Sequence, residues 1–228
     1  MKTLIVCPHP DDEILGCGGA LLRRVSEGGV VAWLLMTSIT EEGGYSTERI
    51  MQRAKEIQRV CDGLKIAPQH FYSVGFPTAE LDSTPMNILV GKMSKVFTSF
   101  QPDEVMVPYP GDAHSDHRVT FEAAAACTKW FRYPSVKRVL AYETLSETDF
   151  GIDPRDPGFK PNVFVDISEQ LEAKLELMQI YESEIDDFPF PRSERTIKAL
   201  AYLRGSQSGY KAAEAFMLLR ERIASKYI

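Results

Sequence analysis

Three of the four histidines of this chain stand beside carboxylates in two short segments. The first segment reads Pro8-His9-Pro10-Asp11-Asp12-Glu13, and the second reads His114-Ser115-Asp116-His117. Histidine nitrogens and carboxylate oxygens are ligands of zinc in hydrolytic sites, where three protein ligands leave one position open for water. We therefore expect the two segments to build a metal-dependent hydrolytic site together.

The spacing within each segment suggests a role for each residue. His9 and Asp12 are three residues apart in a turn that enters a helix, so both side chains can point at one cation. His117 completes a set of two histidines and one carboxylate, to which a zinc ion would bring an acidic water. Asp11 then remains as the general base that accepts the proton of that water.

The second segment also offers a group for the oxyanion that forms when water attacks an amide carbonyl. His114 is the candidate donor, as an imidazolium that Asp116 orients, and it would also protonate the leaving amine. The alternative is structural, because an Asp at the start of a helix often caps it and Glu13 would complement the helix dipole. Capping does not account for His9. His70 has no nearby carboxylate in the sequence and is interpreted as an ordinary strand histidine.

Short apolar runs alternate with longer amphipathic stretches, which predicts an α/β fold with a mostly parallel sheet and helices on both faces. We expect strands at residues 4–7, 29–36, 70–74, 104–108 and 138–143, and an edge strand at 163–166. We expect helices at 14–27, 47–61, 86–100, 117–131, 169–183 (capped by Ser168), 193–203 and 212–225. The two histidine segments follow the first and fourth strands, and α/β sheets bind ligands at the carboxyl ends of their strands.

Composition narrows the range of partners. The 228 residues carry a net charge of −6, which argues against nucleic acid as a partner, and no apolar run is long enough to span a bilayer. The length favours one domain over residues 1–228. The four cysteines form no C-x-x-C pair and no signal-peptide pattern is present, so we expect reduced thiols in the cytoplasm.

The two histidine segments resemble the signatures of the LmbE-like, or PIG-L, family of zinc-dependent N-deacetylases. Supporting similarities are Leu15-Gly16-Cys17-Gly18-Gly19, a late segment from Val165 to Ser183, and Ala213-Glu214-Ala215-Phe216. We interpret the glycines as positions of close helix–sheet contact rather than as a dinucleotide loop, because the G-x-G-x-x-G spacing is missing.

The resemblance implies a Rossmann-like sheet and removal of an acetyl group from an N-acetylglucosamine-type sugar. It implies the same roles for the residues of both segments: His9, Asp12 and His117 as ligands of Zn²⁺, Asp11 as base, and His114 with Asp116 at the oxyanion. It also implies a homo-oligomer and a substrate-binding arginine after the second strand, for which Arg49 and Arg53 are the candidates. The active-site tyrosine that some relatives carry has no counterpart between Phe188 and Arg195.

Two other functions remain as alternatives. A metallophosphoesterase would need more carboxylates to hold two metal ions, and a non-catalytic sugar-binding protein would have lost a ligand or the base. The ligand set also suits Fe²⁺, so the metal is expected to be Zn²⁺ or Fe²⁺.

Overall fold

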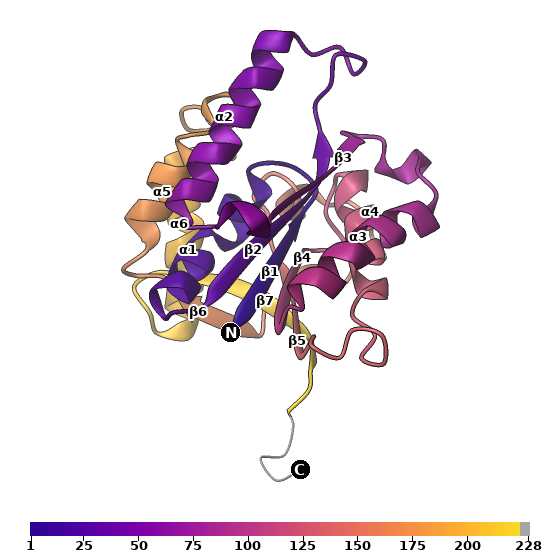
Figure 1. Ribbon diagram of the computed structural model, residues 1–228. Coiled ribbons are helices and arrows are strands. Elements are labelled where there is room, and N and C mark those ends of the chain that lie inside the picture. Colours follow the sequence, from indigo (N-terminus) through magenta and orange to yellow (C-terminus); the bar gives the residue numbers. More distant parts are fainter. Residues whose placement is uncertain (224–228) are drawn as a thin grey trace.

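A seven-stranded sheet runs through the computed structural model, which describes residues 1–223 (Figure 1). Its strands are β1 (Lys2–Cys7), β2 (Val30–Ser38), β3 (Phe71–Pro77), β4 (Glu104–Pro108), β5 (Arg138–Tyr142), β6 (Val163–Asp166) and β7 (Ala213–Glu221). Their order is β3-β2-β1-β4-β5-β7-β6. The first five strands in this order are parallel, and β7 is antiparallel to both of its neighbours. The predicted mostly parallel sheet is confirmed, and β6 is an edge strand as expected.

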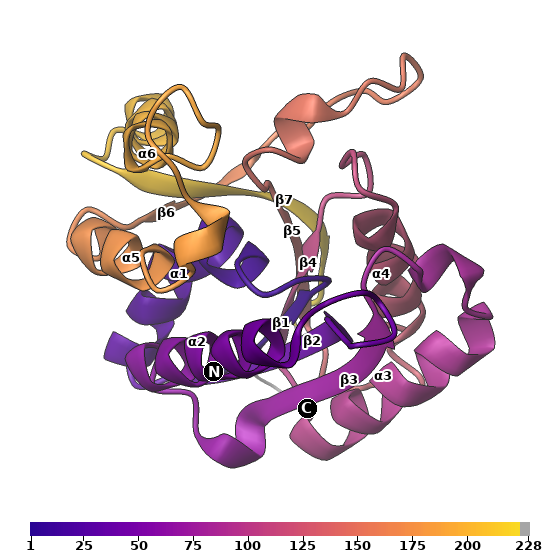
Figure 2. The ribbon, with the colours of Figure 1, turned by 90° about the horizontal axis from the view of Figure 1, so that it is seen from above.

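Helices cover both faces of the sheet, as the alternating pattern predicts (Figures 1 and 2). They are α1 (Asp12–Ser26), α2 (Thr47–Gly63), α3 (Met86–Phe100), α4 (Ser115–Ala126), α5 (Leu171–Met178) and α6 (Glu194–Ser208). Short 3-10 turns occur at Pro68–His70, Leu81–Ser83, Thr148–Phe150 and Glu182–Glu184. A core cluster that includes Trp33, Tyr142 and Phe216 lies on the face of α1, and a second with Leu34 and Phe97 lies on the face of α3 and α4. Within residues 1–223, we find no helix with the length and apolar composition needed to cross a bilayer.

The strand order creates one place where loops from different halves of the sheet must meet. The chain begins at β1 in the middle, adds β2 and β3 on one side, and then returns to add β4 and β5 on the other. β1 and β4 are therefore neighbours, and their carboxyl ends form the topological switch point at which α/β sheets bind ligands. The loops that follow them carry the two histidine segments.

The glycines at the start of α1 allow this helix to lie close to its neighbours. A Cβ atom at Gly19 would lie 2.7 Å from Cγ2 of Ile167, so the interpretation of these glycines as sites of close contact is confirmed. The backbone N–H groups of Gly19 and Ala20 donate to the buried Glu214 carboxylate, which also pairs with Lys174 at 2.7 Å. This network fixes α1, and with it the turn that carries the first histidine segment.

Several predicted elements differ from the structure, and one of them, the helix predicted at 193–203, extends five residues further, to Ser208. The predicted helix at 212–225 is wrong: residues 213–221 form β7, and positions 224 and 225 lie outside the described residues. The reason is tertiary, because this segment fills the gap between β5 and β6 and bonds to both. Ser168 does not cap α5, since its hydroxyl donates to Asp166 instead, and α5 spans only Leu171–Met178. Helix α4 ends at Ala126, five residues earlier than expected.

The four cysteines are free and buried, in agreement with the expected reduced thiols. Burial raises the pKa of Cys61 to about 12, which keeps this thiol protonated at neutral pH. Its side chain lies at the end of α2, where it borders the cavity described below.

Candidate functional site

The two histidine segments meet above the carboxyl ends of β1 and β4. The ring centroid of His9 lies 5.5 Å from that of His117 and 4.5 Å from that of His114. One ligand atom each from His9, Asp12 and His117 can be chosen so that all three atoms lie within 4.8 Å of one another. The structure therefore brings together the three residues that the sequence predicts as metal ligands.

His117 is completely buried, and its two ring nitrogens have different surroundings. Nδ1 lies 2.8 Å from Oδ2 of Asp112 and must carry the proton, because a carboxylate can only accept. Nε2 has no hydrogen-bond partner within the described chain and faces Oδ1 of Asp12 at 3.3 Å. Burial opposes a charge on this ring, but Asp12 and Asp112 outweigh it and raise the pKa of His117 well above its usual value. The pocket therefore favours a cation at this point.

His9 has a matching arrangement with its nitrogens exchanged. Its Nε2 lies 3.0 Å from Oδ2 of Asp116, so Nε2 carries the proton and Nδ1 is left as the electron-pair donor. Nδ1 faces Oδ2 of Asp12 at 3.7 Å, and the same oxygen accepts from the backbone N–H of His9. Metal-binding histidines usually donate their second nitrogen to a carboxylate in this way. The donor set and its supporting carboxylates thus fit a tetrahedral Zn²⁺ with one open position.

The structure corrects the expected relation between Asp116 and His114. The Asp116 carboxylate accepts from His9 and from the backbone N–H groups of Ala79 and Leu81, at 2.7 and 3.1 Å for the latter two. Asp116 reaches His114 through its backbone instead, because its N–H donates to Nδ1 of His114 at 3.1 Å. An imidazolium has no acceptor nitrogen, so the expected charged form is wrong for this geometry. Burial and the neighbouring His9 also lower the pKa of His114. The ring is a neutral donor through Nε2.

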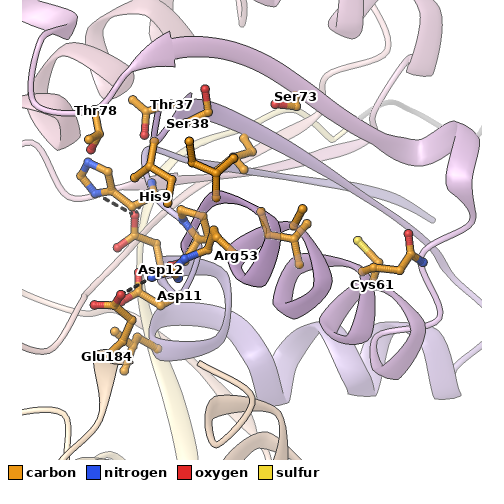
Figure 3. Close-up of a pocket in the computed structure, with 18 of the residues that line it drawn as sticks. His9, Asp11, Asp12, Thr37, Ser38, Arg53, Cys61, Ser73, Thr78 and Glu184 are labelled. Carbon is orange, nitrogen blue, oxygen red and sulfur yellow. Dashed lines mark hydrogen bonds and ion pairs between the residues drawn. The ribbon is translucent and has the colours of Figure 1, made fainter. Parts of the chain in front are cut away.

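Asp11 lies at the N-cap position of α1, yet its side chain makes no capping bond. The capping interpretation is therefore wrong for this residue, whose carboxyl group lines the cavity beside Asp12 (Figure 3). Burial raises the pKa of Asp11 well above its usual value, with further contributions from Asp12 and Glu184. Its backbone is strained, with φ at 126° and ψ at −31°.

Two residues that the sequence analysis did not assign to the site hold Asp11 in this conformation. The Glu13 carboxylate accepts from the Asp11 backbone N–H at 3.0 Å and from the Tyr181 hydroxyl at 2.6 Å. Burial raises the pKa of Glu13 to about 7. The sequence suggested for Glu13 only the helix-dipole role of the structural alternative, and no motif in the sequence links Glu13 to Tyr181.

The strain at Asp11 leads to a stability prediction. Glycine tolerates positive φ without steric cost, whereas alanine does not. An Asp11→Gly variant is therefore expected to be more stable than Asp11→Ala by about 1–2 kcal/mol, although both lose the carboxylate. Urea unfolding of both variants measures this difference. Equal midpoints and slopes would show that the backbone is not strained in solution.

A cavity of about 590 Å³ opens beside the histidines, between α2 and the ends of β2 and β3. Arg49 and Arg53, the two predicted substrate-binding residues, both line it, so neither lies on a purely solvated helix face. Both contact the Glu184 carboxylate, and Arg53 also donates to the backbone carbonyl of Pro10 at 3.2 Å. Figure 3 shows Arg53 and Glu184 close to Asp11 and Asp12.

Sequence reasoning missed a third arginine at this end of the cavity. Arg192 lines it and donates to the backbone oxygen of Glu184 at 2.7 Å and to the Ser146 hydroxyl at 3.1 Å. It comes from the late loop in which we found no tyrosine. Nothing near Arg192 in the sequence indicates this position, because only the tertiary fold brings the loop to the histidines.

Comparison with known proteins agrees with these features. A family model described as GlcNAc-PI de-N-acetylase (PIG-L) matches residues 4–128, more than half of the chain. Diacetylchitobiose deacetylase of Thermococcus kodakarensis is 28% identical over 227 residues, which cover 93% of this chain and 81% of that protein. A 1D-myo-inositol 2-acetamido-2-deoxy-alpha-D-glucopyranoside deacetylase of Saccharopolyspora erythraea is 27% identical, with 81% of this chain and 78% of that protein covered.

Solved structures show the same fold. N,N'-diacetylchitobiose deacetylase from Pyrococcus horikoshii, in complex with an inhibitor, superimposes with a TM-score of 0.77. The match covers 96% of this chain and 84% of that chain at 24% identity. At this identity the likeness supports the Rossmann-like α/β fold and no more.

Proposed function

The chain belongs to the GlcNAc-PI de-N-acetylase (PIG-L) family, and from this premise we propose that it hydrolyses the N-acetyl group of an N-acetylglucosamine-type amino sugar or its conjugate. The products are acetate and a free amine. The observation that carries the proposal is the convergence of His9, Asp12 and His117 at the switch point of the sheet, beside the Asp11 carboxyl group, which makes no capping bond. The two named relatives act on different compounds, but both names describe deacetylases of an acetamido sugar.

A Zn²⁺ ion held by His9, Asp12 and His117 would supply a Lewis acid for the amide carbonyl and an acidic water. Asp112 and Asp116 keep the two histidine rings in the tautomers that this binding requires. Fe²⁺ would suit the same donors, because imidazole and carboxylate bind both ions.

Asp11 acts as the general base and takes a proton from the attacking water. His114 stabilises the oxyanion by donating from Nε2. The leaving amine then takes its proton from Asp11, because a neutral His114 whose Nδ1 already accepts a hydrogen bond has no spare proton to give. Asp11 thereby returns to its ionised form within one cycle.

Arg49, Arg53 and Arg192 form the binding end of the cavity for the sugar. Guanidinium groups donate several hydrogen bonds in a fixed geometry, which suits the hydroxyl groups of a sugar ring. Glu184 contacts all three arginines and holds them towards the hydrolytic residues. It also offers acceptor oxygens at the same end of the cavity.

Removal of the metal tests the proposal. We expect the chelator-treated protein to release amine from N,N'-diacetylchitobiose at least about 100-fold more slowly, since the Lewis acid contributes several kcal/mol. Stoichiometric Zn²⁺ or Fe²⁺ should restore activity at one ion per chain. Activity that survives chelation would exclude a metal-dependent deacetylase. Two ions per chain together with hydrolysis of a phosphate ester would favour the metallophosphoesterase alternative.

A further inference from the structure

The cavity continues well beyond the arginines and the hydrolytic residues. Figure 3 shows this extent, with His9, Asp11 and Asp12 towards one end and Cys61 and Ser73 towards the other. We call this far part the apolar limb. It is lined by Ala54, Ile57 and Cys61 of α2, by Leu35 of β2 and by Phe71 of β3. Ile50, which stands between Arg49 and Arg53 at the near end, continues the same apolar face of the helix.

The residues of α2 in the apolar limb share one face of the helix. Positions 50, 54, 57 and 61 are separated by steps of four, three and four residues, which is the spacing of a continuous apolar stripe. The stripe extends over about 16 Å at the rise of an α-helix. Such a stripe normally buries its whole face against the sheet, but here Ile57 and Phe71 are only partly buried against the core cluster of Leu35, and all three also line the cavity.

Charge is distributed unevenly along the cavity. The arginines and Glu184 gather at the end that holds Asp11, whereas the limb is lined mainly by hydrocarbon side chains. An unfilled apolar space destabilises a protein, because its walls lose contacts that a packed core would make. A preformed apolar space that joins a hydrolytic site is therefore well suited to a hydrophobic part of a ligand.

We propose that the apolar limb binds an aliphatic or aromatic substituent of the amino-sugar substrate. This inference rests on the proposed function, because it takes the sugar to lie among the arginines. The substituent would be carried either by the acyl group, in place of the acetyl methyl, or by the glycosidic position. The substrate class is then an amino sugar with a hydrophobic appendage rather than a free monosaccharide.

Binding of two ligand series that cannot be hydrolysed tests this proposal with the zinc-loaded protein. One series is N-alkyl glucosamines of two to eight carbons, in which the alkyl group takes the place of the acyl chain. The other is alkyl β-glucosaminides of the same lengths. Calorimetry is expected to show that Kd decreases along one series, by about fourfold for each buried methylene.

Ala54 is an exposed lining residue next to Arg53, at the entrance of the apolar limb. An Ala54→Phe variant places a ring at this entrance, and we expect it to remove the dependence of Kd on chain length. Met51→Phe is the matched control, because Met51 is on the same helix, is 56% exposed and does not line the cavity. It should keep the chain-length dependence of the original protein. Thermal unfolding of both variants verifies that each is folded.

Each outcome has a defined meaning. If Kd decreases with chain length in the N-alkyl series, the apolar limb binds the acyl group. If Kd decreases with chain length in the glucosaminide series, the limb binds the aglycone. The proposal would be overturned if Kd did not change with chain length in either series. It would also be overturned if the Ala54→Phe variant kept the same change of Kd with chain length. If the protein released no acetate from acetamido sugars, the proposed function would be refuted instead. The change of Kd with chain length could still be measured, because it does not depend on hydrolysis.

Discussion

An Asp11→Asn variant is expected to release acetate about 10²–10⁴-fold more slowly while it keeps its full content of metal. This range is the usual contribution of one general acid–base residue. Asparagine retains the size of the side chain and tolerates unusual backbone angles better than most residues, so the strained turn should persist. It cannot accept the proton of the attacking water, however, and it has no proton to pass to the leaving amine.

Measurement of kcat tests the expected loss of activity, and metal analysis tests whether the variant keeps its metal. The neighbouring Asp12→Asn variant is the matched comparison, because Asp12 lies between His9 and His117 and its loss should lower the metal content as well. If Asp11→Asn retained full activity, the base would have to be another residue. If it lost the metal, Asp11 would be a ligand rather than the base.

The second large effect is expected at Asp112, which the sequence analysis did not assign to the site. An Asp112→Asn change should weaken metal binding about 10–100-fold, the usual effect of losing a carboxylate that supports a ligating histidine. The Asp112 carboxylate accepts from Nδ1 of His117 and from the Thr148 hydroxyl, at 2.8 and 2.6 Å. An amide at this position is a weaker acceptor and no longer fixes the His117 tautomer.

Competition with a zinc-binding dye gives the affinity of each variant. Asp156→Asn is a suitable control, because Asp156 also accepts a strong hydrogen bond, from the Tyr109 hydroxyl, but does not touch the histidines. Equal metal affinity in Asp112→Asn and the original protein would mean that His117 is not a ligand or that its ring is held by other groups.

The convergence of the proposed hydrolytic residues could be predicted from the sequence because these residues are local to two strand ends. His9, Asp11 and Asp12 lie within one turn, and His117 lies in the first turn of α4. A parallel sheet must bring such turns together when their strands are neighbours. The order of the strands was not visible in the sequence, and the clustering of histidines after β1 and β4 indicated only that the two segments meet at one site.

The groups around the hydrolytic residues are harder to predict, because they come from distant segments. Tyr181 reaches Glu13 across 168 residues, and Arg192 comes from a loop without a recognisable motif. Asp112 is only two residues before His114 in the sequence, yet its contact with His117 depends on how the loop turns before α4. Side-chain contacts of this kind follow from tertiary packing, which periodicity does not describe.

The secondary structure of the last strand, β7, could not be predicted from the sequence either, because it also depends on tertiary packing. Residues 213–221 contain alanine, glutamate, methionine and leucine, all good helix formers, and they nevertheless form β7. The gap between β5 and β6 decides their conformation, and the buried Glu214 then binds α1.

The switch-point arrangement has an evolutionary consequence. The proposed hydrolytic residues belong to the turns after β1 and β4, whereas other walls of the cavity come from α2, from the loop after β5 and from the loop that carries Arg192. Mutations in those walls can therefore change the compound that is accepted without moving the atoms that carry out hydrolysis. Duplicated copies of such a protein can diverge towards new sugars by small steps, because each intermediate keeps an intact reaction centre.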